Sequence, residues 1–154
     1  MLITDLDERG LGISGKKLII KGYPGDEVEA VKRGKYWYVR RVLKAGEHRT
    51  EPKCRHFEEC NACIWQAMKY SSQLKFKQKA VEELFGEVEK IEPSLKIWHY
   101  RNKMELVFLK GKLGYRAFGK WYLAFDLEEC TTAMESLVKE VAKVRRAWKE
   151  SGIK

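Results

Sequence analysis

Apolar and polar residues alternate with a period of two in the first fifty residues, which is the pattern of half-buried strands. Two such runs, residues 27–31 and 36–40, flank a predicted hairpin turn at Gly34. Several short strands joined by glycine turns favour a small β-barrel of the oligonucleotide-binding type. The polar residues 46–53 follow as a predicted linker, so the first domain is expected to cover residues 1–53.

The spacing of apolar residues becomes helical after the linker. In residues 64–88 they recur every three or four positions and predict a helix, for which Asn61 is the candidate N-cap. Thr132 and Glu135 match a capping box, which predicts that a second helix begins there and ends near Gly152.

Between these helices the alternation with period two returns. Residues 97–126 predict an antiparallel meander, in which residues 104–108 form one strand and glycines at 111 and 119 mark turns. Residues 54–154 are therefore expected to form a second domain. The predicted class is α+β: a small β-barrel, a cysteine-containing loop, and an antiparallel sheet with two helices.

The composition fits a folded, water-soluble chain. The sequence has 154 residues, 44% of them hydrophobic. No apolar stretch approaches the roughly 18 residues of a membrane span. The first residues lack the features of a secretory signal, so a cytoplasmic protein without a membrane partner is expected. Lys and Glu total 39 while Asn and Gln total 5, which is typical of a hyperthermophile.

The positive charge is concentrated in two segments. The formal net charge is +9; residues 31–79 carry +9, residues 100–124 carry +5, and residues 80–99 between them carry −3. Such blocks indicate a surface that binds a polyanion. Heat adaptation enriches both signs of charge and therefore does not explain a local excess of one sign.

Aromatic and basic residues are interleaved on the predicted hairpin of the first domain. Small barrels bind single-stranded RNA by stacking bases on aromatic rings while cations follow the phosphates. Alternation predicts that Trp37 and Val39 face the core and that Tyr36, Tyr38 and Arg40 face solvent, although the opposite phase fits the pattern nearly as well. For the basic residues of the second domain, ordinary solvated charge is an equal alternative. The candidate RNA-binding residues are Lys35, Tyr36, Tyr38, Arg40 and Arg41 on the hairpin, with Arg55, Arg101 and Lys103 in the second domain.

All four cysteines of the chain form one candidate metal site. Cys54, Cys60 and Cys63 follow a C-x5-C-x2-C spacing, and Cys130 lies just after the predicted strands. Four thiolates suit either zinc or an iron–sulfur cluster. Zinc sites more often use two close pairs of cysteines, but His56 could replace one cysteine. Disulfides are disfavoured in a cytosolic chain. Spacing alone leaves zinc and iron–sulfur nearly equal.

Several separate segments carry a resemblance to one family: residues 10–13, 24–28, 54–66, 70–77, 100–103 and 113–116, and Cys130. They resemble motifs of the RNA uracil-C5 methyltransferases, in the order in which that family has them. The first two segments resemble the family's TRAM domain, and the others resemble its cysteine-containing domain. One departure is at Asn61 and Ala62, where the family usually has two glycines. A TRAM-bearing radical-SAM protein is a less favoured alternative, because such proteins have a C-x3-C-x2-C spacing and this chain has C-x5-C-x2-C.

The resemblance implies a function and a cofactor. In that family the cysteines that match Cys54, Cys60, Cys63 and Cys130 hold a 4Fe-4S cluster. The expected function is the RNA-binding and iron–sulfur part of an S-adenosylmethionine-dependent RNA (uracil-C5) methyltransferase that acts on tRNA, at a T-loop uridine. The alternatives are 23S rRNA as substrate, or a stand-alone zinc-stapled RNA-binding module without enzymatic activity. An archaeal hyperthermophile is the expected source, and a monomer the expected state.

The chemistry of methylation is not complete in this sequence. Addition to C6 of uracil needs a nucleophile, usually a thiolate, and all four cysteines are assigned to the metal site. Residues 10–15 spell G-x-G-x-x-G, but a predicted strand follows them where a dinucleotide-binding motif requires a helix. In the family, the donor site and the nucleophile lie in a C-terminal domain that would start about where this chain ends. The chain alone is therefore expected neither to bind S-adenosylmethionine nor to methylate RNA.

Overall fold

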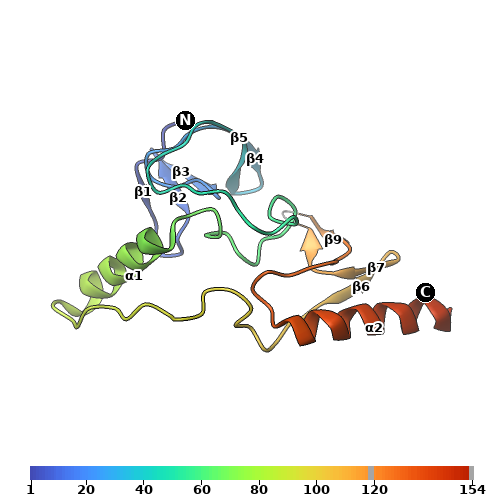
Figure 1. The fold of residues 1–154 in the computed structure, drawn as a ribbon. Coiled ribbons are helices and arrows are strands. Elements are labelled where there is room, and N and C mark those ends of the chain that lie inside the picture. The colour runs from blue at the N-terminus through green and yellow to red at the C-terminus, as the bar shows by residue number, and fades with distance from the viewer. Residues whose placement is uncertain (118–119, 153–154) are drawn as a thin grey trace. The chain divides into compact units, whose positions relative to one another are not determined.

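The computed structural model describes residues 1–117 and 120–152 and has an α+β fold (Figure 1). Its contacts divide the chain into two compact units. The first unit contains Met1–Pro52 and Ile64–Pro93, and the second contains Lys53–Cys63 and Ser94–Lys154. The segment Ile64–Pro93, which we predicted as part of the second domain, thus groups with the N-terminal strands.

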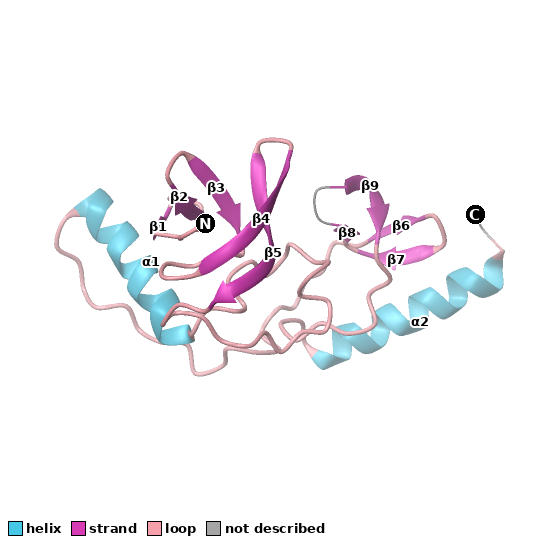
Figure 2. Ribbon diagram, turned by 90° about the horizontal axis from the view of Figure 1, so that it is seen from above, coloured by secondary structure: helices cyan, strands magenta, loops and turns pink. Residues whose placement is uncertain are grey.

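The first unit is built on a mixed five-stranded sheet (Figure 2). Its order is β1-β2-β3-β5-β4, and all neighbours are antiparallel except β3 and β5, which are parallel. An isolated bridge between Leu2 and Glu27 brings the segment before β1 beside β4. A closed barrel remains a prediction. The strands are β1 (Asp5–Leu6), β2 (Gly12–Ser14), β3 (Lys17–Ile20), β4 (Glu27–Arg33) and β5 (Tyr36–Lys44).

The predicted alternation of β5 is confirmed by the core. Ile3, Ile19 and Val28 form a buried cluster, and Trp37 and Val39 pack against it. A bulge then interrupts the alternation, because Ala30 pairs with Val39 and Glu29 with Arg41, which leaves Arg40 without an opposite residue. The inward side resumes at Val42, which also packs against the cluster.

A buried ion pair holds the linker to the sheet. The Asp26 side chain is fully buried, and Arg49 donates hydrogen bonds to both of its carboxylate oxygens through Nε, at 3.0 and 3.1 Å, and to Oδ2 through Nη2, at 2.7 Å. The backbone N–H groups of Tyr23 and Gly46 also donate to Asp26, at 2.8 and 2.9 Å. A Cβ at Gly46 would lie 2.6 Å from the Pro24 carbonyl oxygen, so only glycine allows this approach.

The first helix begins later than the sequence predicts. Helix α1 spans Tyr70–Phe85 with Lys69 as its N-cap, so Asn61 does not cap it. Residues 62–67 before the helix form turns instead, and the Ala67 carbonyl accepts a hydrogen bond from Thr50 N–H at 2.9 Å. Met68 forms a bridge with the linker. Tertiary pairing therefore overrides the helical periodicity of these residues.

The second unit contains two short antiparallel ladders, β6–β7 and β8–β9. The strand predicted for residues 104–108 begins only at Val107, which corrects the predicted meander. Residues 99–101, which come before this strand, pair with the segment after Cys130. Arg101 N–H donates to the Thr132 carbonyl at 2.8 Å, and His99 N–H donates to the Thr131 carbonyl at 3.0 Å. The predicted turn at Gly111 is confirmed, and Gly119 lies outside the described residues. The strands are β6 (Val107–Leu109), β7 (Lys112–Gly114), β8 (Arg116–Ala117) and β9 (Lys120–Ala124).

Helix α2 closes the described chain. It spans Glu135–Ser151, and Gly152 ends it in the left-handed conformation, as predicted. Its N-cap is Met134 rather than Thr132, because the Thr132 hydroxyl faces two cysteine sulfurs instead of the helix. Arg145 ties the helix to the loop after β9 through a 3.0 Å hydrogen bond to Asp126. Among the described residues, neither helix is long and apolar enough to cross a membrane.

Candidate metal centre and nucleic-acid interface

The cysteine loop is a series of tight turns held by His56. Phe57 N–H donates to the Cys54 carbonyl at 3.0 Å, and Cys60 N–H donates to the His56 carbonyl at 2.8 Å. The buried His56 ring stacks on Phe125 with centroids 5.1 Å apart. Its Nε2 accepts the Glu128 N–H at 3.2 Å. Because the ring is used in this way, His56 orients the loop and the four cysteines remain the candidate ligands.

The structure brings the four cysteines into one neighbourhood. The Cys54 sulfur accepts hydrogen bonds from the backbone of His56 and Thr131. The hydroxyl of Thr132 lies 3.7 Å from the Cys63 sulfur and 3.5 Å from the Cys130 sulfur. None of the four is in a disulfide. The segment that begins at Cys130 is therefore the point around which three of the thiols are arranged.

The fourth thiol, Cys60, also belongs to this neighbourhood. Its sulfur accepts a hydrogen bond from the Ala62 N–H at 3.4 Å. Burial raises the pKa of Cys60 to about 11, and the charges of Cys63, Cys54 and Cys130 add to that rise. Burial likewise raises the pKa of Cys54. A bound cation would offset the cost of placing several thiolates here, as metal–thiolate sites require.

The residues present fit a group held by four thiolates. N–H groups directed at cysteine sulfurs are the outer contacts that such groups use. Asn61 lies between Cys60 and Cys63 in the sequence, and its side-chain oxygen is buried without a hydrogen-bond partner among the described residues. In the described part of the chain, no three His, Cys, Asp or Glu side chains already lie close enough together to hold a single metal ion. The four thiols therefore share one neighbourhood, but among the described residues they are not arranged as a preformed site for a single metal ion.

Gly114 and Tyr115, in the segment of residues 113–116, also belong to the surroundings of the cysteines. A Cβ at Gly114 would lie 2.1 Å from the Phe125 carbonyl oxygen, so the close approach of β7 to that segment requires glycine. The neighbouring Tyr115 has a raised pKa because of burial and the nearby charge of Cys130. Residue spacing alone missed the roles of Gly114 and of Thr132; only the resemblance of residues 113–116 pointed to the former.

The three basic residues predicted in the second domain have different surroundings. Arg101 donates to the Ala62 carbonyl at 3.3 Å. Burial by itself would lower the pKa of Arg101, but the charges of Cys63, Tyr100 and Tyr115 and a hydrogen bond with Tyr100 together outweigh burial, and the pKa is raised. Arg55 forms an ion pair with Glu128 at 2.8 Å, and Lys103 pairs with Glu105 at 2.7 Å. Arg101 therefore lies against the cysteine loop, while Arg55 and Lys103 are exposed and paired.

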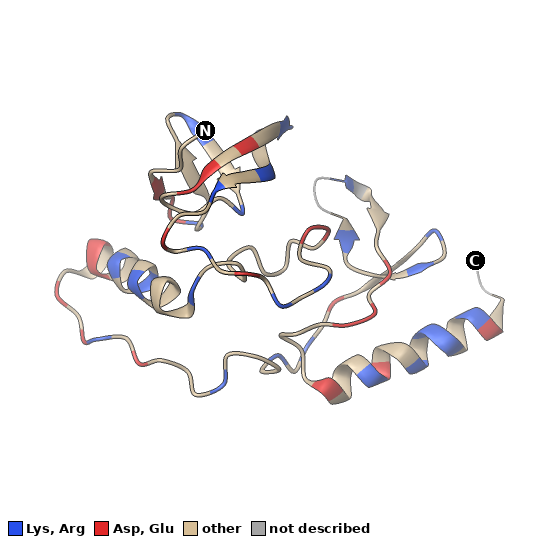
Figure 3. Cartoon of the chain, turned by 45° about the horizontal axis from the view of Figure 1, so that its top comes forward, with Lys and Arg blue, Asp and Glu red and all other residues tan. Residues whose placement is uncertain are grey.

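Lys and Arg residues, blue in Figure 3, lie along the hairpin of β4 and β5 together with Glu residues, which are red. Lys35, Arg40 and Arg41 are exposed, and Tyr36 and Tyr38 are half-buried. Two cations outside the predicted set lie beside these tyrosines: Arg9 lies over Tyr36 and Arg33 over Tyr38, at 5.8 and 5.4 Å from the ring centroids. Lys17 lies over Trp37, which packs against the core, at 4.6 Å from the ring centroid.

Curated RNA uracil-C5 methyltransferases are similar to nearly the whole chain. The tRNA (uracil(54)-C(5))-methyltransferase of Pyrococcus furiosus is 32% identical over 158 residues, which covers 99% of this chain and 38% of that protein. The 23S rRNA (uracil(747)-C(5))-methyltransferase of Pyrococcus horikoshii is 30% identical over 157 residues, again 99% of this chain and 38% of that protein. The chain thus spans well under half the length of these homologues. No family model matches it.

A solved structure shares the fold. The crystal structure of Pyrococcus abyssi tRNA (uracil-54, C5)-methyltransferase, in complex with S-adenosyl-L-homocysteine, matches with a TM-score of 0.79 at 24% identity. The match covers 99% of this chain and 37% of that one. The homologues of this chain are therefore RNA uracil-C5 methyltransferases, and a region of one such enzyme has the α+β fold described above.

Proposed function

We propose that this chain is the RNA-binding and iron–sulfur part of an S-adenosylmethionine-dependent RNA (uracil-C5) methyltransferase. The observation that carries the proposal is the pairing of two facts. The similarity to such enzymes covers 99% of the chain. Cys54, Cys60 and Cys63, which follow one another closely in sequence, lie near the distant Cys130 and the short segment that begins there.

The group bound by the thiols is proposed to be a 4Fe-4S cluster. Cys54, Cys60, Cys63 and Cys130 would be its four ligands, and a bound cluster would supply a rigid cross-link with one-electron chemistry. Thr132 and the backbone N–H groups of the loop would hold the sulfurs in place. Zinc satisfies the same four thiolates and is the competing outcome.

Residues 1–53 are proposed to be a TRAM domain whose sheet closes into a barrel and binds RNA. Support comes from the exposed cations and half-buried tyrosines of β5, and from residues 1–3, whose backbone bonds to β4 join the two ends of the sheet. The RNA is proposed to be tRNA, with 23S rRNA as the second candidate, because homologues named for each match almost equally well.

Donor binding and nucleophilic attack are proposed to reside in another domain. All four thiols of this chain are used in the proposed cluster site. The G-x-G-x-x-G of residues 10–15 contains strand β2 and the first residue of the turn to β3. Because a strand and not a helix follows this turn, the segment does not have the form of a cofactor-binding loop. We therefore expect no calorimetric binding of S-adenosylmethionine and no transfer of a labelled methyl group by this chain. Micromolar donor binding or any turnover would contradict this assignment.

The metal is tested by anaerobic purification. We expect brown protein that absorbs broadly near roughly 400 nm and contains close to four irons per chain, as cysteine-ligated 4Fe-4S clusters require. One zinc per chain, with no iron under any preparation, would replace the cluster with the zinc-stapled alternative while leaving the RNA-binding proposal intact.

RNA binding is tested by titrating the chain with a T-arm of tRNA and with a 23S rRNA hairpin at several salt concentrations. Arg40→Ala combined with Arg41→Ala should lower the slope of log affinity against log salt by about 1 to 2, since each phosphate contact contributes about 0.7 to 0.9. Tyr38→Ala should weaken binding with little change in slope. Equal affinity of the double variant and the parent at low salt would contradict this surface.

A further inference from the structure

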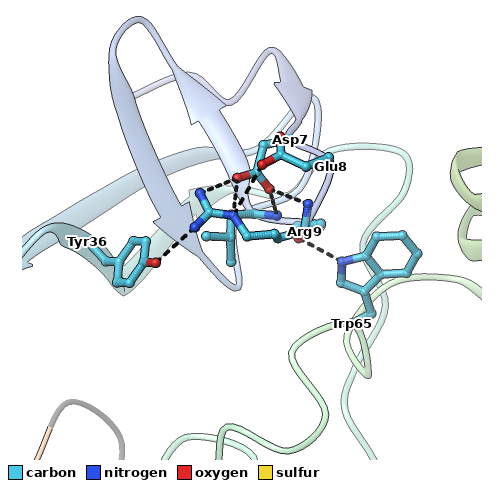
Figure 4. A network of polar contacts seen from close by, with 7 residues as sticks. Asp7, Glu8, Arg9, Tyr36 and Trp65 are labelled. Carbon is cyan, nitrogen blue, oxygen red and sulfur yellow. Dashed lines mark hydrogen bonds and ion pairs between the residues drawn. The ribbon is translucent and has the colours of Figure 1, made fainter. Parts of the chain in front are cut away.

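Arg9 lies beside Tyr36, one of the candidate RNA-binding residues of β5, and its side chain is held in one orientation (Figure 4). Its Nε and Nη2 donate hydrogen bonds to Asp7 Oδ2 at 3.2 and 2.9 Å, and its Nη1 donates to the Tyr36 hydroxyl at 3.1 Å. A guanidinium has five N–H donors, so one N–H on each terminal nitrogen has no partner among the described residues. The side chain is 49% exposed, which leaves these two donors accessible.

The loop that carries Arg9 is built without help from the guanidinium. Asp7 Oδ1 accepts hydrogen bonds from the backbone N–H groups of Leu11 and Arg9, at 2.7 and 3.1 Å. Trp65 donates from its indole to the Gly10 carbonyl at 2.7 Å (Figure 4). The Trp65 ring fills the space where a Cβ on Gly10 would lie, 2.4 Å away. A variant of Arg9 should therefore leave the loop in place.

The charge around Arg9 favours an anion. Lys35 lies 5.1 Å from the centroid of the Tyr36 ring, on the same tyrosine that Arg9 contacts. The Asp7 carboxylate is only 8% exposed and is occupied by four hydrogen bonds, so it positions the guanidinium rather than competing at the surface. Glu8 is the remaining nearby carboxylate; it is 82% exposed, 3.5 Å from Arg9 Nε, and can move into solvent.

We propose that Arg9 binds a backbone phosphate of single-stranded RNA through its two remaining N–H groups, with Lys35 as a second cation. The inference rests on the proposed function, because it takes RNA as the ligand. Arginine pairs with phosphate through two directed N–H groups, which lysine cannot reproduce. Because Asp7 and Tyr36 already hold the guanidinium, little side-chain entropy is lost when the phosphate binds. Arg9 thereby fixes the path of the RNA backbone beside the aromatic residues of β5.

The test is fluorescence anisotropy of the full chain with a labelled oligouridine of about 10 nucleotides, within the site size of such folds. Arg9→Ala should weaken binding about tenfold, as expected for a charged hydrogen-bonded contact, and lower the salt slope by about 0.7. The matched control is Lys16→Ala, which removes one exposed positive charge from the nearby turn after β2. We expect less than about a threefold loss from the control, since it removes only screened surface charge.

Two further measurements separate a phosphate contact from general attraction. Arg9→Lys should restore the salt slope but not the affinity, because the charge returns without the paired donors. On an oligouridine with neutral methylphosphonate linkages, Arg9→Ala and the parent should bind equally.

The inference is overturned if Arg9→Ala loses no more affinity than Lys16→Ala, or loses as much on the neutral probe as on the charged one. Melting temperatures of the variants, measured alongside, should match the parent. Failure of the parent itself to bind any RNA probe at low salt would instead overturn the proposed function, and this inference with it.

Discussion

Each of the two compact units is stabilised internally by a different kind of contact. The first has a five-stranded sheet around Ile3, Ile19 and Val28, and a fully buried carboxylate that Arg49 ties to the linker. The second has two-stranded ladders of two to five residues. Outside these ladders, Arg145 of α2 bonds to Asp126 in the loop after β9, and Arg101 forms a bridge with Ala133 in the segment after Cys130.

This difference indicates which unit would depend on a bound metal for its stability. Two-stranded ladders are marginal by themselves, so the second unit depends on contacts between segments that are distant in sequence. Those contacts lie around the cysteines. The Cys54 sulfur accepts a hydrogen bond from the backbone of Thr131, and the Thr132 hydroxyl is within hydrogen-bond distance of the Cys63 and Cys130 sulfurs. We therefore expect the second unit to depend on a thiolate-bound group and the first to be independent of it.

The largest expected effect is that of Cys60→Ala. Removal of one thiolate should abolish the metal-dependent absorbance and unprotect the amides of β6 to β9, because metal binding is coupled to folding. Hydrogen exchange measured by mass spectrometry should show β2, β3 and β5 of the first unit unchanged. Ser71→Ala, on an exposed position of α1, is the control. Equal loss of protection in both units would contradict the contrast between them.

The next effect is that of Asp26→Ala in the first unit. Arg49 would then be left buried and without its carboxylate, which should lower the free energy of unfolding by about 3–5 kcal/mol. Lys44→Ala, which removes an exposed ion pair with Glu27 at 3.8 Å, should cost less than about 1 kcal/mol. Urea denaturation followed by circular dichroism measures both. A loss below that of the Lys44 variant would mean that the buried pair contributes nothing net.

A smaller effect is expected from Gly114→Ala in the second unit. The new Cβ would lie 2.1 Å from a backbone oxygen, so β7 must move away, at a cost of about 3 kcal/mol for overpacking against backbone. Gly111→Ala, with a positive φ of 77° and open space around it, should cost about 1–2 kcal/mol from strain alone. Thermal melting should rank the two variants in that order; the reverse order would place the critical approach elsewhere.

The smallest effect is that of Thr132→Val, which keeps the shape and removes the hydroxyl near two sulfurs. In the loaded protein, loss of a hydrogen bond to a sulfur ligand should lower the reduction potential of the cluster, because such bonds stabilise its more negative state. The unloaded protein should lose about 1 kcal/mol of stability, the net value of one hydrogen bond. Thr50→Val, at an exposed position, is the control. An unchanged potential would show that Thr132 acts only in packing.

Local signals predicted much of the first unit. Alternation favoured Trp37 and Val39 as core residues, and glycines located the turn at Gly34 in this unit and the turn at Gly111 in the second, because both signals depend on neighbouring residues alone. The same signals failed near the cysteines. Thr132 matches a capping box, yet its hydroxyl is turned to Cys63 and Cys130 and the helix begins at Glu135.

By itself, the sequence determined the α+β class, the alternation of β5, the cysteine spacing and the two basic segments. Only the tertiary structure decided that Asn61 caps no helix, that residues 99–101 pair with the segment after Cys130, and that Arg9 rests on Tyr36. The physical reason is the range of the interactions. Periodicity and turns are set by residues a few positions apart, whereas a thiol, a guanidinium or an extended backbone takes whichever partner the fold brings near.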